Sequence, residues 1–144
     1  MLYPNKFEQK IGFDQIRDLL KKQCLSDLGK NKVDDIRISK DVKFIQILLH
    51  QTHEFKTILQ EENSFPVNHY IDVRQSLEKA KIEGVFLEVH EIFDLKRSLA
   101  AIRSVVHFFR KAAEDEKYPY LQKLVKNVKM YPFVSDSIDR ILTS

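Results

Sequence analysis

His50, His53 and Glu54 form a group of side chains in this sequence that could bind a metal ion. Their spacing of three and four residues places them on one face if the segment is a helix. Metal sites on helices usually need further ligands from other elements, and the sequence supplies no convergent set. We therefore predict two half-exposed histidines and no metal site here. His90 and Glu91 begin an HExxH pattern, but residue 94 is aspartate, so this zinc motif fails as well.

Other catalytic chemistry is also missing from the residue pattern. A phosphate-binding loop needs closely spaced glycines, whereas Gly12, Gly29 and Gly84 are far apart. Cys24 lies beside an apolar helical face, where a packed thiol is more common than a reactive one. No nucleophile, base and orienting group can be assembled. We predict that the chain has no catalytic, cofactor-binding or metal-binding residues and does not itself hydrolyse nucleotide.

Cations repeat every seven residues in the second half of the chain, at Lys96, Arg103 and Arg110. Two interpretations are open. The three side chains could contact the phosphates of a nucleic acid, or their stems could cover an apolar seam while their charged ends meet carboxylates or water. The second is routine in paired helices. The same two interpretations apply to a second group, which combines lysines with interleaved tyrosines: Lys123, Lys126, Lys129, Tyr118, Tyr120 and Tyr131.

The composition predicts one folded, all-α domain over residues 1–144. Hydrophobic residues make up 43% of the sequence and charged residues 31%, which is ordinary for a globular protein. Only 3 Gly and 4 Pro are present among many helix-forming residues, so strands joined by tight turns are not expected. The net charge of +3 is too small to identify a nucleic-acid-binding protein.

The single cysteine cannot form an intramolecular disulfide, which fits a reducing compartment. The N-terminal residues lack the apolar core of a signal peptide, and no later stretch is apolar over the roughly 20 residues that span a bilayer. We predict a cytoplasmic location and no membrane contact.

Hydrophobic periodicity and breaking residues predict a bundle of about six to seven helices. Ser26 should cap the second helix, Gly84 should follow the fourth, and Pro119 should lie in the first turn of the sixth. Pro66 marks a loop in the middle of the chain. The predicted helices cover residues 13–24, 26–39, 42–61, 73–82, 88–114, 119–128 and a last stretch that Ser135 or Ser137 would cap and that still continues where the sequence ends.

Two of these helices carry heptad-spaced apolar residues and are predicted to pair lengthwise as the spine of the bundle. The third helix presents Ile45, Leu48, Thr52, Phe55 and Leu59. The fifth and longest presents Ile92, Leu95, Leu99, Ile102, Val106, Phe109 and Ala113.

The order of several short motifs resembles the N-terminal region of the second bacterial MutS family, the MutS paralogues with a C-terminal Smr domain. The opening segment KIGFDQIRDLLKKQCLSDLGKNKV has the family's serine, Leu-Gly pair and basic residue, and IQILLHQTHEFKTIL is similar to its next helix. The segment DVRQSLEKAKIEGVFL then matches the pattern D-[IV]-R-x-x-L-x-x-A-x-x-G-x-x-L through Asp72, Arg74, Leu77, Ala80, Gly84 and Leu87.

This resemblance implies a non-catalytic core and lever fragment of a longer DNA repair and recombination-control ATPase. Stiff helices would couple a nucleic-acid clamp to ATPase domains beyond Ser144, where ATP, magnesium and an endonuclease domain are expected. The implied partners are the other domains of the parent protein, branched or duplex DNA, the ribosome and a second copy of the chain. Lys96, Arg103 and Arg110 are the candidate nucleic-acid contacts.

A self-contained helical protein-interaction module unrelated to DNA is the competing interpretation, in which a partner helix docks along the heptad seam. A reading frame that continues into a Walker-type glycine loop would favour the first interpretation. A stop codon at that point would favour the second.

Overall fold

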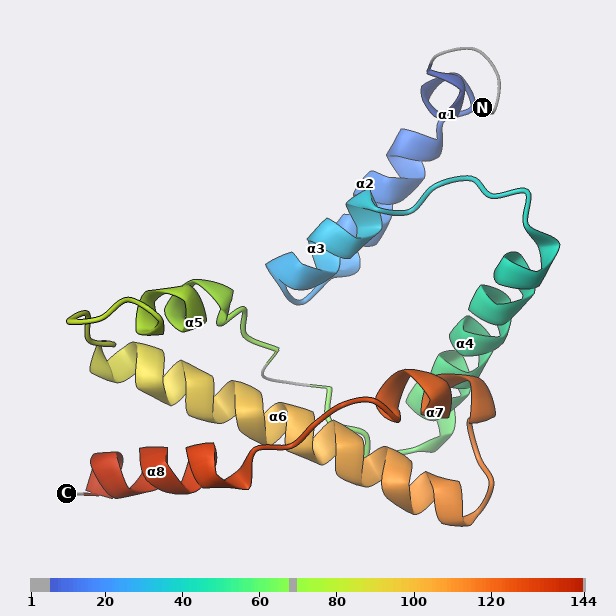
Figure 1. Ribbon diagram of the computed structural model, residues 1–144. Coiled ribbons are helices and arrows are strands. Elements are labelled where there is room, and N and C mark those ends of the chain that lie inside the picture. The colour runs from blue at the N-terminus through green and yellow to red at the C-terminus, as the bar shows by residue number, and fades with distance from the viewer. Residues whose placement is uncertain (1–5, 68–69, 144) are drawn as a thin grey trace. The chain divides into compact units, whose positions relative to one another are not determined.

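A computed structural model describes residues 6–67 and 70–143, and in these ranges it contains eight α-helices and no strands (Figure 1). The predicted all-α class is confirmed. Among the described residues, the structure has one helix more than the seven predicted ranges. The additional helix is the short α1, which the hydrophobic periodicity does not indicate. The helices are α1 (Phe7–Lys10), α2 (Phe13–Gln23), α3 (Asp27–Asp34), α4 (Val42–Glu61), α5 (Arg74–Ala80), α6 (Val89–Glu114), α7 (Pro119–Val125) and α8 (Pro132–Thr143).

The chain divides into two compact units, Met1–Asp41 and Val42–Ser144. The prediction of a single domain over residues 1–144 stays a prediction. Within the described ranges, none of the helices combines the length and apolar character needed to cross a membrane.

The first unit is a small helical hairpin in which α2 packs against both α1 and α3. Ser26 caps α3 as predicted, because its Oγ accepts a hydrogen bond from the Gly29 amide at 3.2 Å. The helix ends at Asp34, however, and not near Ser39. Arg17 ties the unit together by pairing with Glu8 and by donating to the carbonyl of Ile36. Val33 is the one buried hydrophobic residue among the described residues of this unit.

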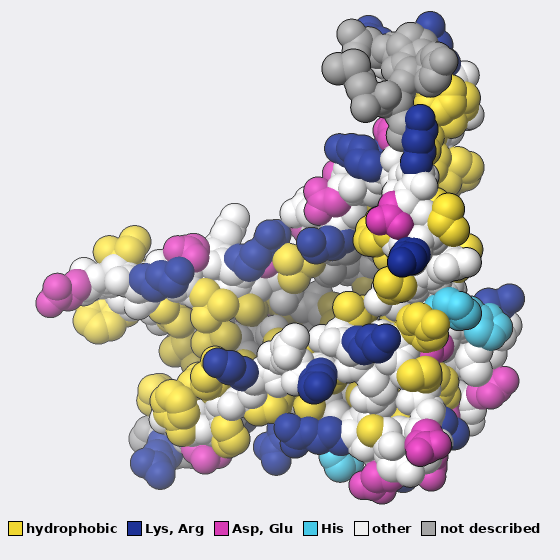
Figure 2. Space-filling model, turned by 45° about the vertical axis from the view of Figure 1, so that its right-hand side comes forward, with side chains coloured by type: hydrophobic (Ala, Val, Ile, Leu, Met, Phe, Trp, Pro, Cys, Tyr) yellow, Lys and Arg dark blue, Asp and Glu magenta, His cyan; other side chains and the backbone are white. Residues whose placement is uncertain are grey.

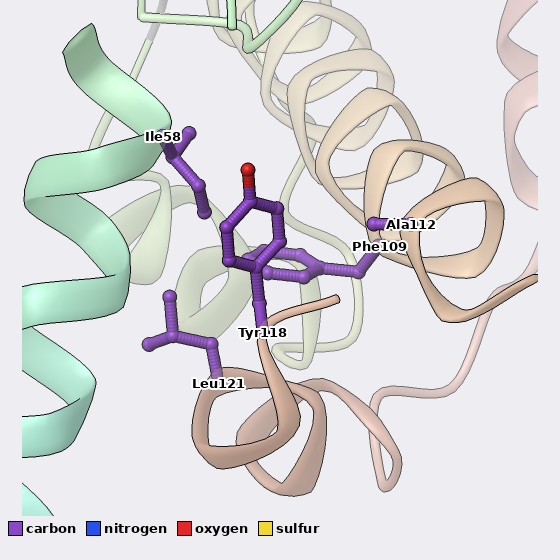
Figure 3. Close-up of a cluster of buried hydrophobic side chains, with 5 residues drawn as sticks. All are labelled: Ile58, Phe109, Ala112, Tyr118 and Leu121. Carbon is purple, nitrogen blue, oxygen red and sulfur yellow. The ribbon is translucent and has the colours of Figure 1, made fainter. Parts of the chain in front are cut away.

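The main core lies in the second unit, where α7 packs against both α4 and α6. Figure 3 shows Ile58 of α4 and Leu121 of α7 facing the Tyr118 and Phe109 rings, with Ala112 next to Phe109 on α6. Ile58 is fully buried. Phe65, from the loop that Pro66 predicted, packs against this cluster, with its ring centroid 5.1 Å from that of Phe108 in an edge-to-face arrangement. A residue from a predicted loop thus belongs to the core.

A second contact joins α6 to α8. The buried residues of these two helices outside the main core cluster include Ser98 and Ala101 on α6 and Ile138 on α8. Small side chains allow two helices to approach closely. The predicted cap of α8 is wrong, since the helix begins at Pro132 and both serines lie inside it. Pro132 suits that first turn because its missing N–H would have had no helical partner.

The predicted lengthwise pairing of the two long helices is also wrong. In Figure 1, α4 and α6 run in different directions and approach each other beside α7. Among the described residues, these two helices do not pack extensively against each other. Ile102 and Ala113 of the predicted seam are exposed, and Ala112 is buried instead. A straight helix with 3.6 residues per turn drifts about 20° per heptad, so a heptad pattern leaves the buried face unless the helices supercoil.

Candidate nucleic-acid interface

The three cations of the predicted stripe lie along one side of α6, because seven residues make almost two full turns of a helix. They do not share one environment. Lys96 is half-exposed and forms an ion pair with Asp139 of α8, with 2.5 Å between Nζ and Oδ1. This contact matches the interpretation in which charged ends meet carboxylates. A pair this exposed stabilises a protein by at most about 1 kcal/mol.

Arg103 and Arg110 are exposed, and neither side chain has a hydrogen bond or ion pair with any residue in the described part of the chain. The two differ in their surroundings. Arg110 lines a groove of about 270 Å³ between α6 and α7, whereas Arg103 does not. Whether these residues contact nucleic acid stays a prediction.

The groove brings together cations that belong to two separate groups in the sequence. Arg110 comes from α6, while Lys123 and Lys126 come from α7 and the residue that follows it. Lys129 of the second group is exposed and does not line the groove. We define the basic groove by its lining residues, which are Val106, Arg110, Gln122, Lys123, Val125, Lys126 and Val128.

Three valines give the basic groove an apolar wall. Val106 is buried, with 5% of its surface exposed, and it anchors this wall in the core face of α6. Gln122 fixes the distance between the two sides, because its side-chain amide donates to the carbonyl oxygen of Phe109 at 2.6 Å. This hydrogen bond thus holds together the two helices that carry Arg110 and Lys123. The lower part of Figure 2 shows Lys and Arg side chains mixed with exposed hydrophobic ones.

The position of α7 depends on a carboxylate from another helix. Glu54 of α4 accepts hydrogen bonds from the backbone amides of Tyr120 at 3.0 Å and Leu121 at 2.8 Å. Amides in the first turn of a helix have no partner within the helix, so Glu54 satisfies two of them. The negative charge also complements the positive end of the helix dipole.

Two aromatic contacts reinforce this attachment. His50 stacks on Tyr120 with 4.4 Å between ring centroids and 11° between ring planes. On the same ring, the Lys123 ammonium lies 5.2 Å from the centroid, within the range of a cation–π contact. His50 and Glu54 are therefore structural residues that hold α7 in place. The sequence predicts only that His50 and His53 are half-exposed. Among the described residues, no group of three or more His, Cys, Asp and Glu side chains could hold a metal ion.

At the residue before α7, Tyr118 donates a hydrogen bond to Glu62 at 2.9 Å, and Lys117 pairs with the same carboxylate. Burial of the phenol, reinforced by its bond to Glu62, raises the pKa of Tyr118 to about 12. The Tyr118 hydroxyl and the Lys117 ammonium lower the pKa of Glu62. Both shifts favour the neutral phenol beside the ionised carboxylate.

The remaining candidates from the sequence lie apart from the basic groove. Cys24 is partly buried at the end of α2, and its Sγ lies 3.4 Å from the carbonyl oxygen of Leu20. His90 is exposed and contacts Glu88 at 3.2 Å. Glu91 instead completes a capping box at the start of α6 and pairs with Lys79 of α5 at 2.7 Å. These contacts are structural.

Comparison with known proteins gives a consistent result. A protein named Endonuclease MutS2 from Alkaliphilus oremlandii is 26% identical over 134 residues, which cover 93% of this chain and 17% of that protein. The proteins of the same name from a Geobacillus species and from Staphylococcus saprophyticus are 28% identical over 133 residues and 27% identical over 129 residues. These two alignments cover 92% and 88% of this chain and 17% and 16% of the relatives.

This chain therefore spans about a sixth of the length of these relatives. No family model and no solved structure matches it. The order of motifs in the sequence and these alignments point to the same family. The chain is thus related to a segment of the MutS2 family, whose members here carry the name Endonuclease MutS2.

Proposed function

We propose that this chain is a non-catalytic helical lever within a MutS-family protein, where it couples a nucleic-acid clamp to ATPase domains. The observation that carries the proposal is the similarity to Endonuclease MutS2 over 93% of the chain but only 17% of the relative. In this proposal the endonuclease and ATPase activities, with ATP and magnesium, belong to other parts of the parent protein. DNA is the proposed ligand of the parent protein. Binding to the ribosome and to a second copy of the chain stays a prediction.

The structure offers a suitable lever in α6. Its 26 residues extend about 39 Å at the rise of an α-helix. A capping box fixes its first turn, and α8 and α7 pack along different parts of its length. A helix supported in this way resists bending, so a displacement at one end reaches the other end with little loss.

The test is to interrupt α6 in the full-length protein that contains this chain. Ala100 is exposed in the middle of α6, so Ala100→Pro removes no buried side chain, while it breaks one backbone hydrogen bond, kinks the helix and costs about 3 kcal/mol of helix stability. We expect the basal rate of ATP hydrolysis to persist, while its stimulation by branched DNA falls at least fivefold.

Ala100→Ser is the matched control, because serine continues the helix and should leave stimulation unchanged. If Ala100→Pro prevents folding, Ala100→Gly weakens the helix by only about 1 kcal/mol and should reduce stimulation in part. Undiminished stimulation in a folded Ala100→Pro protein would contradict the lever role.

One observation favours the alternative of a protein-interaction module. Large hydrophobic side chains are exposed along the first half of α4, at Val42, Ile47, Leu48 and Leu49. Exposed apolar residues on one element are typical of a surface that meets another protein. In the Ala100 test, this alternative predicts that neither ATP hydrolysis nor its stimulation by DNA depends on α6.

A further inference from the structure

We infer that the basic groove between α6 and α7 binds the phosphodiester backbone of a nucleic acid. Arg110 and Lys123, with Lys126, would contact the phosphates, and the valine wall would face the sugars. This inference goes beyond the lever role, because it gives the segment a ligand of its own. It also selects Arg110 from the predicted stripe and leaves Lys96 to its ion pair with Asp139.

Uncompensated charge is the first argument. None of the lining residues is acidic, so three positive charges surround one groove without a carboxylate among them. Several other cations of the same unit, though not Arg103, do meet carboxylates, as in the pairs Lys79–Glu91, Lys96–Asp139, Arg97–Asp94 and Lys117–Glu62. Like charges held together repel each other, and an anionic ligand relieves that repulsion.

The hydrogen-bonding character of the groove is the second argument. Arginine and lysine side chains are donors only, and the Gln122 amide already donates to Phe109. A phosphodiester oxygen is an acceptor only, so it fits this set. A peptide would also bring backbone N–H donors, for which the Gln122 side-chain oxygen is the one side-chain acceptor among the lining residues. The groove therefore suits a nucleic-acid backbone better than an acidic peptide.

Size is the third argument. At about 270 Å³ the groove is smaller than the roughly 300–1,000 Å³ of sites that enclose a whole small molecule. A polymer needs to place only one or two units against such a surface. The two sides are held by Gln122 from within and by the attachment of α7 to Glu54, so the helices that carry the cations need no rearrangement before binding.

The experiment measures binding of the 144-residue chain to fluorescein-labelled oligonucleotides by anisotropy. The probes are a 20-nucleotide single strand of DNA, the same sequence as RNA, and the DNA duplex. The groove variant carries Arg110→Gln, Lys123→Gln and Lys126→Gln. The control variant carries Lys43→Gln, Lys56→Gln and Lys111→Gln, which removes the same charge from exposed residues of the same unit that do not line the groove.

We expect the groove variant to lose at least tenfold in affinity and the control variant less than threefold. The slope of log K against log salt should fall by about 2 for single strands in the groove variant, since each lost phosphate contact removes roughly 0.7. Comparison of DNA with RNA then identifies the source of the phosphodiester. Circular dichroism verifies that both variants are folded. If the triple groove variant does not fold, the single substitution Lys126→Gln replaces it in the same measurement.

Three results would overturn the inference. They are an equal loss of affinity in the two variants, an absence of binding by the folded wild-type chain at low salt, and equally effective competition by polyglutamate. None of these bears on the stimulation of ATP hydrolysis through α6, so the groove and the lever role can fail separately.

Discussion

At the scale of single residues, Tyr118 shows how packing and hydrogen bonding hold an unfavourable backbone conformation. Its φ of 57° lies in the left-handed region, which costs a non-glycine residue roughly 1–2 kcal/mol. The conformation turns the chain from α6 into α7 and directs the ring into the core (Figure 3). Burial of the ring, together with the hydrogen bond to Glu62, offsets that cost.

The pKa of Tyr118 gives a prediction at high pH. Because its folded pKa is about 12 and its ordinary value is 10.0, the phenol stabilises the fold fully below pH 10. This contribution is lost as pH rises toward 12. We expect the free energy of unfolding of the wild-type chain, measured in urea, to decline more steeply between pH 10 and 12 than that of Tyr118→Phe. Parallel curves for the two proteins would show that the phenol is not perturbed.

Ile58 tests the core with a control at the next position. Ile58 is fully buried against Leu121 and Tyr118, so Ile58→Ala should lower the free energy of unfolding by about 2–5 kcal/mol. Leu59 is 54% exposed, and Leu59→Ala should change stability by no more than about 0.5 kcal/mol. Thermal unfolding followed by circular dichroism measures both, and similar losses at the two positions would contradict the assigned core.

At the scale of elements, local signals in the sequence were sufficient to place most helices. The N-cap at Ser26, the glycine at position 84 with its φ of +78° and Pro119 in a first turn act within a few residues, so they can be recognised without a structure. Pairing of α4 with α6 was predicted wrongly, because a heptad pattern states which residues are apolar but not which helix covers them. Here α7, with only seven residues, occupies that place.

The basic groove was beyond the reach of sequence reasoning for a similar reason. Arg110 and Lys123 lie thirteen positions apart, on different helices, and the turn between α6 and α7, with positive φ at Glu116 and Tyr118, brings them to one groove. The sequence places each of these two cations on its own helix. A pattern search cannot find a contact that depends on the angle between two helices.

The attachment of α7 to α4 gives a prediction about one element. Glu54→Gln removes the charge and turns one acceptor into a donor facing the amides of Tyr120 and Leu121. We expect a loss of roughly 1–2 kcal/mol and faster hydrogen exchange at these two amides than elsewhere in α7. Glu61→Gln, on the exposed end of the same helix, is the control and should leave both amides protected. If hydrogen exchange at these two amides is unchanged in Glu54→Gln, Glu54 does not cap α7.

At the scale of the whole molecule, the two compact units differ in how much apolar surface they bury. The second unit contains a cluster of five buried residues around Ile58 and a further contact between α6 and α8. In the first unit, Val33 is the one buried hydrophobic residue among those described, and large side chains such as Leu19 and Leu25 are 57% and 76% exposed. A segment of about 40 residues rarely folds alone without disulfides, metals or a partner.

This difference predicts what a cut between the units does. A fragment of residues 42–144 should unfold cooperatively, with a melting temperature within about 5 °C of the full chain, because its core contains no residue from the first unit. A fragment of residues 1–41 should lack a cooperative transition. If the larger fragment instead melts without cooperativity, the two units stabilise each other and the single domain predicted from composition is the better description.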